Sequence, residues 1–572
     1  MKDAIRLALL PAALCASFGA LAQQTATPIQ NVIVLFQENV SFDHYFGTYP
    51  NAQNNTGETP FYPYPLTPTV NGLGPELLTS NPNLNAAGTA KVNPVRLSPA
   101  QAYTCSQNHN YGPEQQALDS GMLDLFPKYT GRVTSEGCAA DGSTVLAYYD
   151  GNTVTALWNY AQNYALNDNS FGSTFGPSSP GAINLVSGQT YNGTLYFGSG
   201  TTTSAYPTTY ASGSTVVTDI GDFDPYLDDC GADAGGTATG TATLRMNGKN
   251  IGDLLNAAGV TWGWFQGGFA PTTAATVTST GTTITPASCG AAHTEHPGVP
   301  NPNWGYTPNG QYADIHVSTP DYVPHHNPFQ MYASTSNPHH LPPTAGVTIG
   351  AADPLNYTTM TGANHNYDAS VFIQALQNGT LPAVSFVKAP AYENGHPGNS
   401  DPTSEQNWIV NVINTAMQSP QWNNMLIIIA YDDSDGWYDH VTGPVVSPSK
   451  TAVDAYNGTG ECGNPVANAN PARCGHGPRL PLLVISPWAN PNFVDHTLTD
   501  QTSVIAFIEQ NWNVGYIDGA TAPAAGQASF DRAAGTITNM LNFGATPWTA
   551  PLFLNCNGTY AASTPAAGLV CP

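Results

Sequence analysis

Three short apolar runs, rich in β-branched residues, constrain the fold of this chain more than any other feature of its sequence. They are NVIVLF (31–36), MLIIIAY (425–431) and PLLVIS (481–486). Each run is apolar at consecutive positions, so a strand built from it would be buried on both faces. Strands of that kind are typical of a parallel sheet that is covered by helices. The three runs therefore predict central strands of one mainly parallel sheet.

Segments with helical periodicity lie between and around these runs, at residues 114–129, 152–166, 368–379, 404–418 and 502–512. Strands that alternate with helices predict an α/β sandwich. The main α/β domain is expected over residues 23–190 and 319–515, with residues 516–572 as a C-terminal extension packed on its core. Residues 191–318 are rich in Thr, Gly and Ala, which predicts an inserted cap of loops and β-hairpins.

The first 22 residues have the pattern of a Sec-type signal peptide. Lys2 and Arg6 precede an apolar stretch, and Ala20-Leu21-Ala22 resembles a cleavage site. No later run of 18 apolar residues is present, so we expect no stable insertion into a membrane. The sequence thus predicts a protein that is secreted or periplasmic.

Eight cysteines follow the predicted signal peptide. An even number in an exported chain indicates disulfides, and free buried thiols are the alternative. Short loops lose the least entropy on closure, which favours pairing between neighbours in sequence. The expected pairs are Cys105–Cys138, Cys230–Cys289, Cys462–Cys474 and Cys556–Cys571.

The net charge of −25 makes nucleic acid a poor partner. Charged residues make up only 9% of the chain, so any phosphate-bearing ligand would need a metal ion or histidines to bind it.

Two of the apolar runs end in oxygen-bearing side chains, Glu38-Asn39 and Asp432-Asp433. Ligands of a parallel α/β sheet bind at the carboxyl ends of its strands. Carboxylate and amide oxygens suit Ca²⁺, Mg²⁺ or Mn²⁺, and Zn²⁺ also accepts them. Two ordinary strand-ending turns are the alternative. Taken together, the two pairs predict a site for one divalent metal ion.

A third segment, FGPSSPGAINLVSG, places Ser178 or Ser179 near the start of a predicted helix. The free N–H groups and the dipole of a helix N-terminus favour phosphate, and a serine beside a metal ion can be an activated nucleophile. Simple N-capping is the alternative. Histidines in polar loops, where catalytic groups concentrate, include His109, His325, His326 and His396.

These segments, in their order along the chain, resemble one known family. ENVSFDHYFGTYPN, FGPSSPGAINLVSG, PHHNPF, ENGHPGNSDP, YDDSDGWYDHV and GHGPRLPLLVISP are similar to motifs of the secreted bacterial phosphoesterases. That family includes phosphatidylcholine-type phospholipases C and respiratory-burst-inhibiting acid phosphatases. The resemblance implies an α/β fold like that of alkaline phosphatase, a three-layer α/β/α sandwich with a mainly parallel central sheet.

The resemblance also implies a role for individual residues. Ser178 matches the nucleophile and a metal ligand, and the other implied metal ligands are Glu38, Asn39, Asp432 and Asp433. The histidines implied to surround the phosphate are His109, His325, His326 and His396, while His440 and His496 stay outside this set.

The nucleophile segment separates two branches of the family. Phospholipase C members typically show Gly-Pro-Thr-Asn-Pro-Asn-Arg, whereas this chain has Gly-Pro-Ser-Ser-Pro-Gly at 176–181. We therefore predict an acid phosphatase that cleaves phosphate monoesters through a phosphoserine, with an acidic to near-neutral optimum. A phospholipase C that acts on phospholipid headgroups is the alternative, and a non-catalytic binding protein on the same fold is a third.

Overall fold

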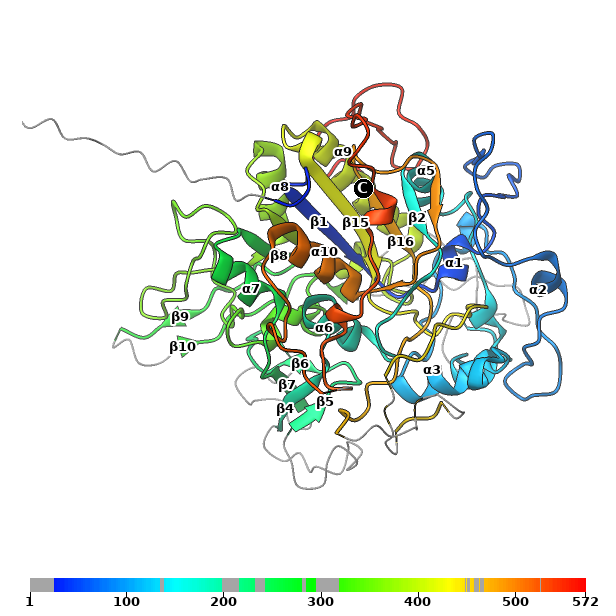
Figure 1. Ribbon diagram of the computed structural model, residues 1–572, viewed down its shortest axis with the longest axis horizontal. Coiled ribbons are helices and arrows are strands. Elements are labelled where there is room, and N and C mark those ends of the chain that lie inside the picture. The colour runs from blue at the N-terminus through cyan, green and yellow to red at the C-terminus, as the bar shows by residue number, and fades with distance from the viewer. Residues whose placement is uncertain are drawn as a thin grey trace, which may run out of the picture.

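The computed structural model describes residues 25–133, 138–197, 216–231, 242–279, 284–294, 318–447, 449, 453–456, 462, 468–524 and 526–571 (Figure 1). The predicted signal peptide lies outside the described residues. A central sheet has eight strands in the order β13-β8-β14-β1-β15-β16-β2-β17. Their bounds are β1 (Asn31–Gln37), β2 (Ala165–Asn167), β8 (Trp262–Gln266), β13 (Asn366–Asp368), β14 (Val384–Lys388), β15 (Met425–Tyr431), β16 (Leu482–Ile485) and β17 (Phe493–Asp495).

The three apolar runs form β1, β15 and β16, next to one another at the centre of this sheet. β1 is parallel to both β14 and β15, but β16 is antiparallel to its neighbours β15 and β2. The expectation of a parallel strand at 481–486 is therefore wrong. An apolar run indicates that a strand is buried on both faces. It carries no information about the direction of that strand. The sheet is mostly parallel, as predicted.

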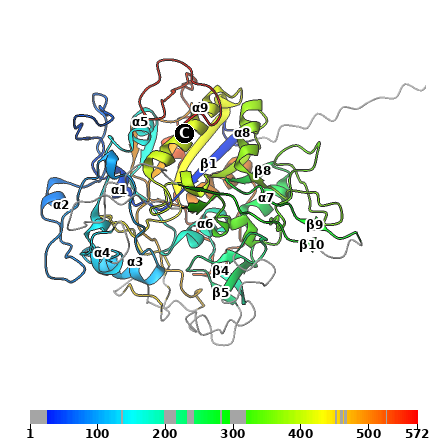
Figure 2. The same cartoon turned by 180° about the vertical axis from the view of Figure 1, so that it is seen from behind.

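Side chains of β1 alternate between two cores, which explains why the whole run is apolar. Val32, Val34 and Phe36 belong to one core, and Ile33 and Leu35 belong to the other. Helices α6 (Ser178–Ser187), α7 (Ile251–Ala258) and α10 (Thr502–Trp512) supply the first core. Helices α5 (Thr155–Asn163), α8 (Ala369–Asn378) and α9 (Pro402–Gln418) supply the second. Helices thus cover both faces of the sheet, as Figure 2 shows from behind.

The range 191–318 is only partly an addition to this core. It forms a separate sheet of β4 (Tyr191–Phe197), β5 (Val216–Thr218), β6 (Asp224–Pro225) and β7 (Ala242–Met246). However, it also supplies α7 and β8, the second strand from one edge of the central sheet. The expected insertion therefore encloses one helix and one strand of the main layers. Further two-stranded pairs are β9 (Thr276–Val277) with β10 (Ile284–Thr285), β11 (Ala292–Thr294) with β12 (Ser318–Pro320), and β3 (Ser170–Phe171) with β18 (Thr499–Asp500).

Four short helices lie on the side of the molecule away from β8 (Figures 1 and 2): α1 (Phe42–Phe46), α2 (Pro75–Thr79), α3 (Tyr111–Leu118) and α4 (Phe126–Tyr129). After α10 the chain packs back on the core, where Leu554 is buried and its carbonyl accepts a hydrogen bond from Asn414 of α9. None of the described helices has the length and hydropathy that crossing a bilayer requires.

All four expected disulfides are present, which confirms the pairing by sequence proximity. They join Cys105 to Cys138, Cys230 to Cys289, Cys462 to Cys474 and Cys556 to Cys571. Each pair has Cα atoms 5.3 to 5.5 Å apart, which lies within the ordinary range for a disulfide.

Candidate active site

The ends of β1 and β15 bring four of the five predicted metal ligands, Glu38, Asn39, Asp432 and Asp433, to one edge of the sheet. The two strands are parallel neighbours, and Gln37 pairs with Tyr431 at their last position. The residues that follow each strand are therefore adjacent in space. The Asn39 N–H donates to Asp432 Oδ1 at 3.1 Å, and the Asp433 N–H donates to the same oxygen at 2.8 Å.

All four of these side chains are buried, and their donor atoms fit a cation. Both polar atoms of the Asn39 side chain lack a hydrogen-bond partner among the described residues, although Asn39 is fully buried. A buried amide without a partner costs free energy that a ligand can offset. Asn39 also has a φ of 46°, a left-handed conformation that asparagine tolerates. Carboxylate and amide oxygens are donor types that hard divalent cations accept.

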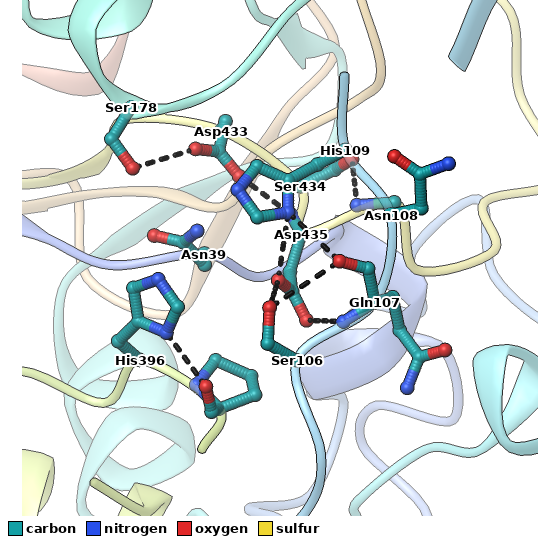
Figure 3. A network of polar contacts seen from close by, with 12 residues as sticks. Asn39, Ser106, Gln107, Asn108, His109, Ser178, His396, Asp433, Ser434 and Asp435 are labelled. Atoms are coloured by element: carbon teal, nitrogen blue, oxygen red, sulfur yellow. Dashed lines mark hydrogen bonds and ion pairs between the residues drawn. The ribbon is translucent and has the colours of Figure 1, made fainter. Parts of the chain in front are cut away.

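Ser178 and Ser179 begin α6, but their side chains have different surroundings. The Ser178 hydroxyl donates to Asp433 Oδ2 at 3.0 Å, so it lies against the predicted ligands (Figure 3). The Ser179 hydroxyl instead donates to the His325 carbonyl at 3.3 Å, and its N–H donates to Asp222 Oδ1 at 3.0 Å. Of this pair, therefore, only Ser178 has a hydrogen bond to one of the acids predicted to bind the metal ion.

The four predicted histidines form a chain of rings beside these groups. The ring centroids of His325 and His326 are 4.6 Å apart, those of His326 and His396 are 6.5 Å apart, and those of His396 and His109 are 6.2 Å apart. His326 Nδ1 lies 2.9 Å from Glu38 Oε1. Figure 3 shows His109 and His396 gathered with Ser178 and Asp433 around the Asn39 amide.

The surrounding charges divide these histidines into two kinds. Burial lowers the pKa of His109, but the carboxylates of Asp433 and Asp435 outweigh it and raise this pKa well above the ordinary value. Burial is likewise outweighed at His325, where Asp222 and Asp224 raise the pKa to about 9. At His326, burial and the neighbouring His325 and Lys388 lower the pKa well below the ordinary value. The rings at the two ends of the chain, His325 and His109, are therefore held as cations, whereas the His326 ring is held neutral.

Two further residues belong to this site, although no sequence motif indicated them: Lys388 and Glu114. Lys388 ends β14, and its ammonium contacts Glu38 Oε1 and lies 3.3 Å from Asp432 Oδ2. Glu114 of α3 accepts hydrogen bonds from the Gly176 N–H at 2.8 Å and the Ser434 hydroxyl at 2.7 Å. It thereby joins the loop before Ser178 to the loop after β15. A lysine directly after the apolar run VSFV, in a chain with 13 Lys and Arg, was the signal that could have revealed Lys388.

A second acidic cluster lies at Asp43, Asp439 and His440, but basic side chains within the fold already pair with its two carboxylates. Arg479 is fully buried and donates to Asp43 Oδ1 at 3.0 Å and to Asp439 Oδ1 at 3.1 Å. His440 is bound to Asp43, and this carboxylate raises the pKa of His440 against the effect of burial. We assign this cluster to holding the loop after β1. The His496 side chain is 68% exposed and paired with Asp168, outside the chain of four rings.

Comparison with known proteins places the chain among phosphoesterases and their relatives. The Phosphoesterase family matches residues 29–515. A non-hemolytic phospholipase C of Burkholderia pseudomallei is 24% identical over 548 residues, covering 93% of this chain and 62% of the relative. A second non-hemolytic phospholipase C, from Pseudomonas aeruginosa, is 30% identical over 40% of this chain and 37% of the relative. The non-specific phospholipase C3 of Arabidopsis thaliana is 34% identical over 23% of this chain and 24% of its own length.

This chain spans less than two thirds of the length of each of these relatives. The family match nevertheless covers most of the chain and includes β1, α6, β15 and every predicted ligand and histidine. The resemblance of the sequence motifs is therefore confirmed, and the chain belongs to the phosphoesterase family.

Proposed function

We propose that this chain hydrolyses phosphoric esters, with Ser178 as the nucleophile beside one divalent metal ion. The hydrogen bond from the Ser178 hydroxyl to Asp433, next to the unpartnered Asn39 amide, carries this proposal. A cation held by Glu38, Asn39, Asp432, Asp433 and Ser178 supplies the charge that lowers the pKa of the serine hydroxyl. Ca²⁺, Mg²⁺, Mn²⁺ and Zn²⁺ are the candidates.

The residues of the chain then divide the work of phosphoryl transfer. Asp433 holds the Ser178 hydroxyl at the start of α6, where the positive end of the helix dipole favours phosphate oxygens. Ser178 Oγ attacks phosphorus, the bond to the leaving alcohol breaks, and a phosphoserine forms. The cationic rings of His109 and His325 stabilise the phosphate charge, and a protonated histidine beside the site gives a proton to the leaving oxygen. Water then releases phosphate from Ser178 when the substrate is a monoester, and the phosphorylated headgroup when it is a diester.

These charges define the expected dependence of activity on pH. His109 and His325 stay protonated at neutral pH because their carboxylate neighbours raise both pKa values. An acidic to near-neutral optimum therefore remains the prediction, with activity falling as the pH rises through about 9, the pKa of His325.

For the substrate, we place phospholipase C activity ahead of monoester hydrolysis. The relatives are named phospholipases C, and one of them aligns with 93% of this chain. A phosphodiester of the phosphorylcholine type is thus the first substrate class. Phosphate monoesters are the second, because the segment Gly-Pro-Ser-Ser-Pro-Gly departs from the phospholipase C pattern. The four disulfides support export, and we place the protein outside the cytoplasm.

One experiment separates these readings. Purified protein of known metal content is assayed on a phosphorylcholine diester and on an aryl phosphate, before and after chelation. We expect chelation to abolish activity, one of the four cations to restore it, and the diester to have the higher kcat/KM. Faster turnover of the aryl phosphate would establish the monoester reading instead. Full activity in metal-free protein would contradict the proposed role of a metal ion. An absence of turnover of either substrate with metal present would favour the third alternative, a non-catalytic binding protein.

A further inference from the structure

Lys388 occupies an unusual place for a lysine, because its charged end is buried among strand ends. It is the last residue of β14, and its side chain is 1% exposed. The side chain passes the end of β1, with the ammonium 4.8 Å from the centre of the Phe36 ring. The ammonium then contacts Glu38 Oε1 after β1 and lies 3.3 Å from Asp432 Oδ2 after β15. It thus bridges residues that follow two different strands.

The carboxyl groups around this ammonium need positive charge to balance them. Glu38, Asp432 and Asp433 place three carboxyl groups within one buried region. Buried carboxylates are costly unless positive charge and hydrogen bonds compensate them. Among the described residues, only Lys388 brings a fixed positive charge into contact with both Glu38 and Asp432. His326 also contacts Glu38, with its Nδ1 2.9 Å from Oε1, but no contact between His326 and Asp432 in the described part of the chain joins the two carboxylates as Lys388 does.

The positions of the contacts leave other oxygens free for a cation. Lys388 and His326 both approach Oε1 of Glu38, while Oε2 has no hydrogen-bond partner among the described residues. Asp432 Oδ1 accepts two backbone N–H groups, and its Oδ2 faces Lys388. The ammonium therefore holds two carboxylates from one side, with Glu38 Oε2 and the Asn39 amide unpartnered.

We propose that Lys388 is an internal counterion, a positioning residue that holds Glu38 and Asp432 together before a metal ion binds. One ammonium and one divalent ion balance three carboxylates, so the centre needs a single metal ion. This inference rests on the metal centre of the proposed function. It is tested without any substrate, so its failure is distinguishable from a failure of the proposed phosphoesterase activity.

The test compares Lys388→Met with the wild-type protein in thermal unfolding, without metal and with saturating Mn²⁺. Methionine keeps most of the aliphatic stem, so this change removes the charge with little loss of packing. We expect the metal-free variant to unfold several degrees below the wild type. Mn²⁺ is expected to raise the Tm of the variant more than that of the wild type, because the ion then supplies the missing charge. By linkage, calorimetry should give a Kd for Mn²⁺ at least as tight as in the wild type.

Two matched variants serve as controls. Lys388→Arg keeps the positive charge and is expected to unfold above Lys388→Met in metal-free buffer. Lys128→Met makes the same chemical change at an exposed position of α4 and is expected to leave both Tm values unchanged. Elemental analysis of the wild type should find one bound ion per chain.

Three outcomes would overturn the proposal. The first is an equal loss of Tm with and without Mn²⁺, which is the result of a packing role alone. The second is a metal-free Lys388→Met protein as stable as the wild type. The third is two ions per wild-type chain. If metal-free Lys388→Met does not fold, Mn²⁺ must restore folding, and failure to do so while Lys388→Arg folds also counts against the proposal.

Discussion

The difference between Ser178 and Ser179 shows what a single position decides in this protein. The two serines are neighbours at the start of α6, and their local sequence gives them the same capping chemistry. In the folded chain, Ser178 bonds to Asp433 after β15, whereas Ser179 bonds to the backbone of His325 and to Asp222. The partners of both serines come from distant parts of the sequence. The proposal of Ser178 and not Ser179 as the nucleophile therefore rests on tertiary contacts.

Replacement of each serine tests this choice. Ser178→Ala is expected to lower kcat by about 1000-fold or more, because it removes the attacking oxygen. Ser179→Ala removes only a hydrogen bond to a carbonyl and is expected to keep kcat within about tenfold of the wild type. Steady-state kinetics on the better of the two proposed substrates provides the measurement, and circular dichroism confirms folding. Loss of turnover in Ser179→Ala alone would assign the nucleophile to Ser179.

At the scale of elements, helix α6 depends on one close approach to the strand beside it. A Cβ atom on Gly181 would lie 2.0 Å from the carbonyl oxygen of Asp432. Only a residue without a side chain lets the start of α6 come this close to the end of β15. This approach places Ser178 against Asp433. The glycine thus sets the position of Ser178, the proposed nucleophile, relative to the predicted ligands.

Gly181→Ala is expected to move α6 away from β15. Overpacking of this kind typically costs about 1 to 3 kcal/mol of stability. Because the shift also separates Ser178 from Asp433, kcat should fall by more than the change in stability explains. Urea unfolding and steady-state kinetics measure the two effects. Gly248→Ala is the control, since a Cβ there meets nothing within 4 Å, and its stability should stay within about 0.5 kcal/mol of the wild type. Unchanged kcat in Gly181→Ala would contradict this role.

The sequence predicted elements more reliably than their ends or directions. The segment 404–418 matches α9, and 502–512 matches α10. The segment 114–129 instead forms α3 and α4, because Asp119 and Ser120 adopt left-handed conformations between them. The short strands β8 and β14 carried no run that stood out, yet both lie in the central sheet. Helical periodicity in the sequence does not reveal a break such as the one at Asp119 and Ser120. A strand of only five residues is too short for its apolar pattern to identify it.

For the molecule as a whole, Glu405 joins three elements beneath the candidate site. This residue of α9 is fully buried, and it accepts hydrogen bonds from Tyr45 at 2.8 Å and from Tyr431 at 2.7 Å. Burial raises the pKa of Glu405 to about 8, although the tyrosine hydrogen bonds oppose the rise. The folded protein therefore holds a proton on Glu405 that the unfolded chain releases above its ordinary pKa.

This raised pKa predicts how the stability of the fold depends on pH. The contribution of protonated Glu405 is fully present below the ordinary pKa and is lost as the pH rises to about 8. Glu405→Gln is neutral at every pH and should remove this part of the loss. Urea unfolding at pH 5 and pH 8 measures the free energy of unfolding at each pH. Its decrease between the two should be smaller in Glu405→Gln than in the wild type, by roughly 4 kcal/mol at most. Glu76→Gln, at an exposed position, is the control. An unchanged decline in Glu405→Gln would show that Glu405 is ionised in the folded state.

The sequence by itself determined the α/β class, the central strands β1 and β15, the four disulfides and the family. These follow from local properties: unbroken apolar runs, loop lengths between cysteines, and motifs that stay contiguous in the chain. Only the tertiary structure decided the direction of β16, the place of β8 in the main sheet, and the roles of Lys388 and Glu114. Each of these depends on contacts between residues far apart in sequence. Lys388 is an ordinary lysine until the ends of β14, β1 and β15 bring its ammonium to Glu38 and Asp432.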